Sequence, residues 1–189
     1  MSGGRHLSEE GQRDLLALAR EALQAHFDGR PRPALPGEGV LASPGSAFVT
    51  LTRRSDHDLR GCIGFIESGR TLAAVVAEAA VAAATRDDRF APVAEAELPA
   101  LQIDISVMGP LEPIDPEDVE VGVHGLVVQY GSRRGLLLPQ VPLEHGWDRE
   151  QFLEWTCRKA GLPVDTWRKP GCEVLAFTAQ VFGEDEGTS

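Results

Sequence analysis

At 189 residues, 42% of them hydrophobic, the chain is long enough to form one large domain or a domain with a smaller lobe. Its 18 basic and 29 acidic residues give a net charge of -11, which opposes nonspecific binding to nucleic acid or anionic lipid, because both require a positive surface. The three cysteines, Cys62, Cys157 and Cys172, show no C-x-x-C spacing, which argues against a disulfide framework and a zinc ribbon. We therefore expect no nucleic-acid or membrane partner, no metal and no cofactor.

The first predicted element is a helix that Ser8 caps and that runs from about Glu9 to Asp28. Its apolar residues recur at helical spacing and form one stripe: Leu15, Leu18, Ala19, Ala22 and Leu23. The N-terminal residues lead into this amphipathic helix rather than into an apolar secretory segment, and the apolar run 72–84 is too short to span a bilayer. The cytoplasm is the expected location.

A hairpin, a helix and a further strand are predicted next. Residues 46–53 alternate as a strand does, and residues 59–66 pair back on them. An Ala-rich helix is expected over 69–85, where small side chains allow close packing on a sheet, and a strand over 101–108. The prolines and glycines between 30 and 45 predict a loop.

The second half of the chain predicts another hairpin, over 125–130 and 135–138, and a last helix capped by Asp148. Residues 173–182 predict a final strand, and residues 184–189 a disordered acidic tail. The residues of the final strand expected to face inward are Leu175, Phe177, Ala179 and Val181.

The strands come mainly as hairpins, and the helices do not alternate regularly with them. This pattern favours an α+β fold with a mainly antiparallel sheet flanked by helices over a doubly wound parallel sheet.

The segment Leu59–Gly64, with the sequence LRGCIG, is typical of a strand interrupted by two glycines, and such glycines often mark close approach of a ligand or another backbone. Alternation places Arg60, Cys62 and Gly64 on one face, with Gly64 leaving an opening, and Gly61 on the other. A fixed positive charge favours thiolate over thiol, so Arg60 is expected to activate Cys62. The alternative is that Cys62 packs as a small apolar residue and Arg60 forms a structural ion pair.

A nucleophilic Cys62 needs a base. His124, before a predicted strand, is the first choice, and His57 and His145 are alternatives. His124 is equally consistent with a histidine that hydrogen-bonds to the backbone of a turn. No two residues among Cys62, His57, His124 and Asp58 have a recognised metal-ligand spacing, so no metal site is predicted.

Further segments flank the hexapeptide in a characteristic order. Ala47–Leu51 precedes it, and five segments follow it: Asp88–Phe90, Pro110–Ile114, His124–Leu126, Gly135–Val141 and Thr156–Pro163. Together they resemble the AMMECR domain family, protein A of the AmmeMemoRadiSam systems, from about the first helix to Phe182. One position departs from the pattern: the family stretch usually reads Asp-Pro-Arg-Phe, and here Asp88 stands in place of proline.

The resemblance implies a single AMMECR-like domain over 1–189, ordered over about 8–182 and followed by a tail at 183–189. It implies a main α+β body and a smaller lobe that form a groove lined by the Cys62 strand. It also implies functional association with a radical-SAM enzyme and a Memo-like protein. It does not imply a particular reaction.

Two functions are consistent with these residues. The first is an accessory or binding protein that holds a small ligand, a modified peptide or a partner protein in the groove. The second is a cysteine-dependent enzyme in which Cys62 acts as nucleophile or redox thiol, Arg60 activates it and His124 is the base. The candidate binding residues are Arg60, Gly61, Gly64, Arg89, which follows the second helix, and Gln140, the polar end of an apolar run.

Overall fold

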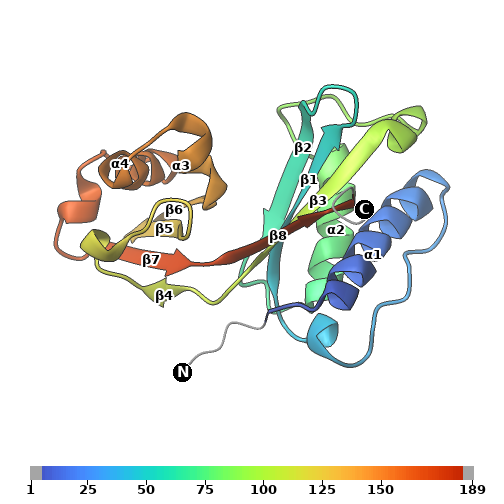
Figure 1. Cartoon of the computed structure of the whole chain (residues 1–189), viewed down its shortest axis with the longest axis horizontal. Helices are drawn as coiled ribbons and strands as arrows, with labels where there is room; N and C mark the ends of the chain where they lie inside the picture. Colours follow the sequence, from blue (N-terminus) through green and yellow to red (C-terminus); the bar gives the residue numbers. More distant parts are fainter. Residues whose placement is uncertain (1–5, 185–189) are drawn as a thin grey trace. The chain divides into compact units, whose positions relative to one another are not determined.

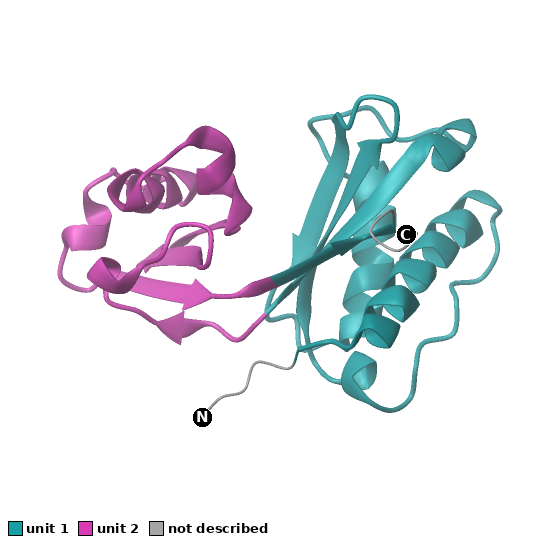
Figure 2. Ribbon diagram, viewed as in Figure 1, with its two compact units in different colours: residues 1–108, 180–189 teal, residues 109–179 magenta. Residues whose placement is uncertain are grey.

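The computed structural model describes residues 6–184. They fall into two compact units, one formed by residues up to 108 and from 180 on, and one formed by residues 109–179 (Figure 2). Each unit contains a β-sheet with helices packed on it, and the pairing within the sheets is antiparallel, so the predicted α+β class is confirmed. Within the described residues, no helix combines the length and the apolar character needed to cross a membrane.

The sheet of the first unit has the strand order β2-β1-β3-β8 (Figure 1). Its strands are β1 (Ser46–Arg53), β2 (Leu59–Phe65), β3 (Leu101–Met108) and β8 (Ala179–Gly183). β1 pairs antiparallel with both β2 and β3. In that register Thr50 lies opposite Cys62 on one side and opposite Asp104 on the other, so these three residues form one row across the sheet.

Two helices, α1 (Glu9–Phe27) and α2 (Leu72–Thr85), cover one face of this sheet (Figure 1). Ser8 and Thr71 cap them, because each side-chain oxygen accepts a hydrogen bond from a backbone N–H three residues further on. The predicted start of α1 is confirmed, and α2 begins three residues later than the sequence predicts because Thr71 is its cap.

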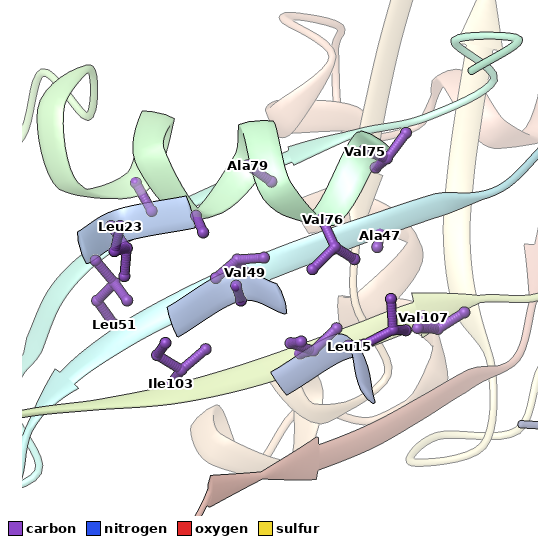
Figure 3. Packing of buried hydrophobic residues seen from close by; sticks show 14 of the residues in the cluster. Leu15, Leu23, Ala47, Val49, Leu51, Val75, Val76, Ala79, Ile103 and Val107 are labelled. Carbon is purple, nitrogen blue, oxygen red and sulfur yellow. The ribbon is translucent and has the colours of Figure 1, made fainter. Parts of the chain in front are cut away.

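The core of the first unit lies between these helices and the sheet (Figure 3). Leu15 and Leu23 of α1 and Val76 of α2 are buried there. The alternate residues of β1 and β3 that point towards the helices are also buried: Ala47, Val49, Leu51, Ile103 and Ile105. The other set of alternate residues on these strands therefore lies on the opposite face of the sheet.

The sheet of the second unit has the order β4-β7-β5-β6. Its strands are β4 (Glu112–Pro113), β5 (Gly125–Tyr130), β6 (Arg133–Leu137) and β7 (Glu173–Phe177). Helix α3 (Gln140–His145) is followed by α4 (Arg149–Lys159), which packs against β5 and β6. The largest buried residues of this core are Leu126, Phe152 and Leu153. Short 3₁₀ segments complete the two units: Val40–Ala42, Glu95–Ala100, Pro116–Asp118 and Thr166–Arg168.

The final strand differs from its prediction. It divides at Thr178 into β7 and β8, which belong to different sheets. Val181, expected to face inward, is 51% exposed, whereas Phe182 is buried in the core of the first unit. Phe177 is buried against Gly125, outside the core cluster of the second unit. The expectation is therefore wrong for Val181, and also for Leu175, because Val174 and Ala176 are the β7 residues in the core of the second unit, whereas Phe177 is buried as expected.

Glu184, predicted as the first residue of the disordered acidic tail, is instead part of the folded first unit. Its carboxylate accepts hydrogen bonds from Arg20 Nε at 2.8 Å, from Arg54 at 3.0 Å and from the backbone N–H of Ile103 at 3.0 Å. These bonds explain why Glu184 is ordered. Residues 185–189 lie outside the described part of the chain.

Candidate functional site

The face of the first sheet opposite α1 and α2 carries a set of mostly polar residues. We call it the polar face and define it by Phe48, Thr50, Cys62, Gly64, Asp104 and Ser106. Alternation on the strands places them there, because their neighbours in sequence are the residues that pack on the helices.

Cys62 carries the thiol of the polar face, and this residue is partly exposed. Thr50, directly opposite on β1, donates a hydrogen bond from Oγ1 to Cys62 Sγ at 3.2 Å. A hydroxyl that donates to sulfur favours the thiolate, because a hydrogen bond to the charged form of a group stabilises that form.

A carboxylate holds the backbone of Cys62 from the outer edge of β2. Asp87, whose side chain is only 4% exposed, accepts a hydrogen bond from Cys62 N–H at 2.8 Å. It also accepts bonds from Arg89 Nε at 2.9 Å and Nη2 at 2.7 Å. These bonds to the Arg89 guanidinium, with the two backbone amides, hold the pKa of the Asp87 carboxyl well below its usual range, although burial opposes them.

Arg89 is the cation that the structure places beside Cys62. Its Nη2 lies 3.5 Å from the carbonyl oxygen of Cys62. Its pKa is raised, first by the hydrogen bonds to Asp87 and also by the negative charge that Cys62 can carry. The side chain is 54% exposed, so part of the guanidinium faces solvent.

Arg60 has different partners from those the sequence suggests. Its guanidinium donates to the Glu97 carboxylate at 2.9 Å and to the carbonyl oxygens of Ala91 and Pro92, and its side chain is 13% exposed. Glu97 balances its charge, and the pKa of Glu97 is lowered, first by the Ala94 amide and then by Arg60. The structural ion pair, which was the alternative interpretation for Arg60, is therefore present.

The two glycines of the hexapeptide lie on opposite faces, as alternation predicts. Gly61 faces α2, where a Cβ would stand 2.1 Å from the carbonyl oxygen of Ala83. Gly64 is on the polar face, where a Cβ would stand 2.3 Å from the ring of Phe48. The expected opening at Gly64 is therefore occupied by the Phe48 ring.

His124 and Gln140 belong to the second unit. His124 Nδ1 accepts a hydrogen bond from the backbone N–H of Glu120 at 3.0 Å, so the histidine does bond to the backbone of a turn. Gln140 is the first residue of α3, not the end of a strand, and its buried Oε1 has no hydrogen-bond partner within residues 6–184. His57 lies exposed in the β1–β2 turn, and the His145 ring lies 4.6 Å from that of Trp147.

Sequence reasoning did not identify Thr50 or Asp87. Counting back from the turn of the predicted hairpin would pair Thr50 with Gly61, because a β-bulge between Leu51 and Thr52 shifts the register by one residue and the sequence does not reveal it. Asp87 was out of reach as well, because its contact with Cys62 spans 25 residues and depends on how the chain turns after α2. In the part of the chain that the structure describes, no group of three or more His, Cys, Asp or Glu could hold a metal ion.

We expect the other two cysteines to react slowly with iodoacetamide in the folded protein. Cys157 is fully buried, and burial raises the pKa of its thiol and, in the same way, that of Cys172. Peptide mass spectrometry after timed labelling at pH 7 should show Cys62 modified first and Cys157 modified only on unfolding. Labelling of Cys157 in the native protein at the rate of Cys62 would contradict this ranking.

Comparison with known proteins gives one consistent result. The family model described as AMMECR1 matches residues 16–182. Protein MK0488 of Methanopyrus kandleri is 45% identical over 187 residues, an alignment that covers 94% of this chain and 90% of that protein. Protein MJ0810 of Methanocaldococcus jannaschii is 44% identical over 175 residues, an alignment that covers 89% of this chain and 87% of that protein. The crystal structure of the uncharacterized protein PH0010 from Pyrococcus horikoshii superposes with a TM-score of 0.87 at 38% identity, covering 95% of this chain and 94% of that one.

Proposed function

Because the chain belongs to the AMMECR1 family, we propose that it is a binding protein of an AmmeMemoRadiSam-type system. Its polar face, around Cys62, would hold a small ligand, a modified peptide or a partner protein. The observation that carries the proposal is the partly exposed Cys62, fixed by Thr50 on one side and by the Asp87–Arg89 pair on the other.

The state of the carboxylate favours binding over acid–base catalysis. Asp87 accepts a hydrogen bond from the Cys62 amide, and its lowered pKa keeps it ionised near neutral pH. A group so far from the working pH is a poor general acid or base. Its hydrogen bonds instead fix the position of β2 and of Arg89, as a pre-formed binding site requires.

The proposed partners are a radical-SAM enzyme and a Memo-like protein. This part of the proposal rests on the family, since AmmeMemoRadiSam systems contain these two proteins besides the AMMECR protein. The net charge of the chain does not favour one of these two partners over the other. To either partner the polar face presents hydrogen-bonding groups and a thiol.

The test is the affinity of the purified chain for the purified radical-SAM enzyme and Memo-like protein of the same organism, measured by titration calorimetry. Cys62→Tyr adds bulk to the polar face and should weaken binding at least about tenfold, which is 1.4 kcal/mol. The matched control is Leu35→Tyr, which adds the same ring to an exposed residue of the loop between α1 and the 3₁₀ segment Val40–Ala42, outside the sheet, and should change nothing. Absence of binding to both proteins, or equal affinity of the Cys62 variant and the wild type, would overturn the proposal.

A second function is favoured by one specific observation. The Thr50 hydroxyl donates directly to Cys62 Sγ, and the Arg89 guanidinium is the neighbouring cation. Both stabilise a thiolate, the form in which cysteine acts as nucleophile or redox group. A cysteine-dependent reaction at Cys62 is therefore the alternative to binding alone. In it Arg89 takes the activating role that the sequence analysis gave to Arg60, and His124 stays the candidate base from the sequence.

A further inference from the structure

We infer that the second unit carries an interaction surface for a partner protein segment that combines apolar and basic side chains. This inference goes beyond the proposed function, because it concerns residues 109–179 and not the polar face. It is carried by three exposed apolar side chains on neighbouring segments and by the unpaired negative charge around them. We call these side chains the apolar patch and define it by Val123, Leu143 and Trp155.

The apolar patch exposes much of its hydrophobic surface to solvent. Leu143 is 60% exposed, which is the highest value for a large hydrophobic residue within 6–184, and Val123 and Trp155 are 48% and 40% exposed. Single exposed apolar residues are common on protein surfaces, whereas several that lie together and are surrounded by polar groups mark interaction sites. The patch therefore requires that its members lie on segments in contact with one another.

Contacts within the second unit join these segments. Val123 lies in a turn whose Gly122 packs against Leu143 of α3, since a Cβ at Gly122 would stand 3.1 Å from Leu143 Cδ1. The segment before this turn contacts the start of α4, where the Arg149 guanidinium donates to the carbonyl oxygen of Glu117. The turn, α3 and α4 thus form one continuous part of the second unit.

The aromatic part of the patch belongs to a fixed stack. The rings of Trp147 and Trp155 are parallel, with centroids 5.0 Å apart and an interplanar angle of 4°. His145 lies against Trp147 at 4.6 Å, and the Arg158 guanidinium lies over Trp155 at 4.6 Å. The backbone N–H of Trp147 donates to the carbonyl oxygen of Pro142 and ties the stack to α3.

This stack determines what Trp155 can offer a partner. Because other side chains of the chain cover its ring faces, Trp155 has no free face on which a nucleobase or a sugar ring could stack. Its exposed part is instead a pre-ordered apolar anchor. Tryptophan is prominent among the few residues that contribute most of the binding free energy at protein–protein interfaces.

The charge around the patch favours a basic partner. Residues 109–131 and 135–148 contain no lysine or arginine. The same segments carry six exposed carboxylates that form no ion pair within residues 6–184: Asp115, Glu117, Asp118, Glu120, Glu144 and Asp148. Complementary charge across an interface speeds association and disfavours wrong partners, so lysine or arginine side chains are expected opposite these carboxylates.

The same charge disfavours other occupants of the patch. A second copy of this chain would bring an equally acidic surface, and an anionic lipid headgroup or a nucleic acid would also bring negative charge. A protein segment with apolar anchors for Leu143 and Trp155, and with basic residues for the carboxylates, satisfies both the apolar and the acidic character of this surface.

The test measures the binding of two synthetic peptides to the whole purified protein by titration calorimetry at pH 7. The first peptide is about four helical turns long and contains only leucine and lysine, with the leucines on one face. The second has glutamate in place of every lysine. The leucine–lysine peptide should bind with a Kd of about 100 μM or below. The leucine–glutamate peptide should bind at least about tenfold more weakly, because it repels the carboxylates.

An apolar variant locates this binding on the patch. Leu143→Asn removes an exposed apolar side chain and should weaken binding of the leucine–lysine peptide about tenfold, because its contact area is lost. The matched control is Leu35→Asn, which makes the same change at an exposed leucine of the first unit and should leave the affinity unchanged. Thermal melts establish that both variants are folded.

A charge variant tests the acidic surroundings. The double substitution Glu117→Gln and Glu120→Gln should weaken binding of the leucine–lysine peptide about fivefold at low salt, and far less at about 0.5 M salt, because salt screens exposed charges. Glu9→Gln with Glu10→Gln is the control, since it removes two exposed carboxylates from α1 of the first unit and should not change the affinity.

Four results would overturn the inference. The first is no measurable binding of the leucine–lysine peptide, and the second is an equal loss of affinity in Leu143→Asn and Leu35→Asn. Equal affinity for the two peptides would remove the basic partner. Self-association of the chain, or binding to phosphatidylglycerol vesicles, that Leu143→Asn abolishes would assign the patch to a second copy or to lipid instead.

Discussion

Gly61→Ala is expected to lower the free energy of unfolding by about 3 kcal/mol, at the upper end of the usual cost of overpacking. The added Cβ would stand 2.1 Å from the carbonyl oxygen of Ala83 and 2.9 Å from its carbonyl carbon. Both are backbone atoms of α2, so no side-chain rotation relieves the clash, and the helix has to move away from β2. Urea unfolding followed by circular dichroism measures the loss as a lower midpoint.

The matched control for this substitution is Gly37→Ala. A Cβ at Gly37 meets nothing within 4 Å, and its φ lies outside the left-handed region, so the midpoint should be unchanged. Equal stability of the Gly61 variant and the wild type would show that α2 does not lie as close to β2 as the structure has it. Close packing against α2 would then not explain why position 61 is a glycine.

Asp87→Asn is expected to destabilise the protein by about 2 kcal/mol at pH 7, because it removes the charge of a buried carboxylate that accepts hydrogen bonds from the half-exposed Arg89 side chain and from the Cys62 amide. The effect depends on pH with a definite sign. The pKa of Asp87 is lower in the folded than in the unfolded protein, where it is near 3.9, so its ionised form stabilises the fold above that value. This stabilisation is lost as the pH falls from about 5 through the unfolded pKa towards the lower folded one.

Urea midpoints at pH 7 and at steps down to pH 3 measure this difference. The gap between wild type and Asp87→Asn should be largest at pH 7 and should shrink as the pH falls. The control is Asp88→Asn, which removes a carboxylate that is adjacent in sequence but exposed. A gap that stays constant with pH would mean that the ionised state of Asp87 does not stabilise the fold.

Local patterns in the sequence are enough to predict much of the fold. The bounds of β1, β3 and β5 follow from alternation, and the start of α4 follows from its Asp148–Gln151 capping box. Helix α3 was not predicted, because Pro139 and Pro142 indicate a turn. Proline is in fact compatible with a first helical turn, whose N–H groups have no partner within the helix.

The sequence predicts those features of the candidate site that are set within a single strand, but not the contacts between distant segments. Alternation placed Cys62 and Gly64 on one face and Gly61 on the other, and the structure agrees. The charge partner of the thiol depends on a turn after α2 that brings Arg89 back to β2, and nothing in the local pattern distinguishes Arg89 from Arg60. Long-range contacts of this kind are set by tertiary packing, so the sequence alone did not reveal them.

The most direct test of the central claim compares two arginine variants in the alkylation of Cys62 by iodoacetamide at pH 7. Arg89→Gln removes the charge but keeps an amide donor for Asp87, and it should slow alkylation by about threefold to tenfold, because a nearby cation favours the thiolate. Arg60→Gln removes a charge that Glu97 already balances and should leave the rate within about twofold. Thermal melts of both variants confirm that they are folded at the labelling temperature. Slower alkylation in the Arg60 variant, or a rate in the Arg89 variant equal to that of the wild type, would contradict the assignment of Cys62 and Arg89 as one functional site.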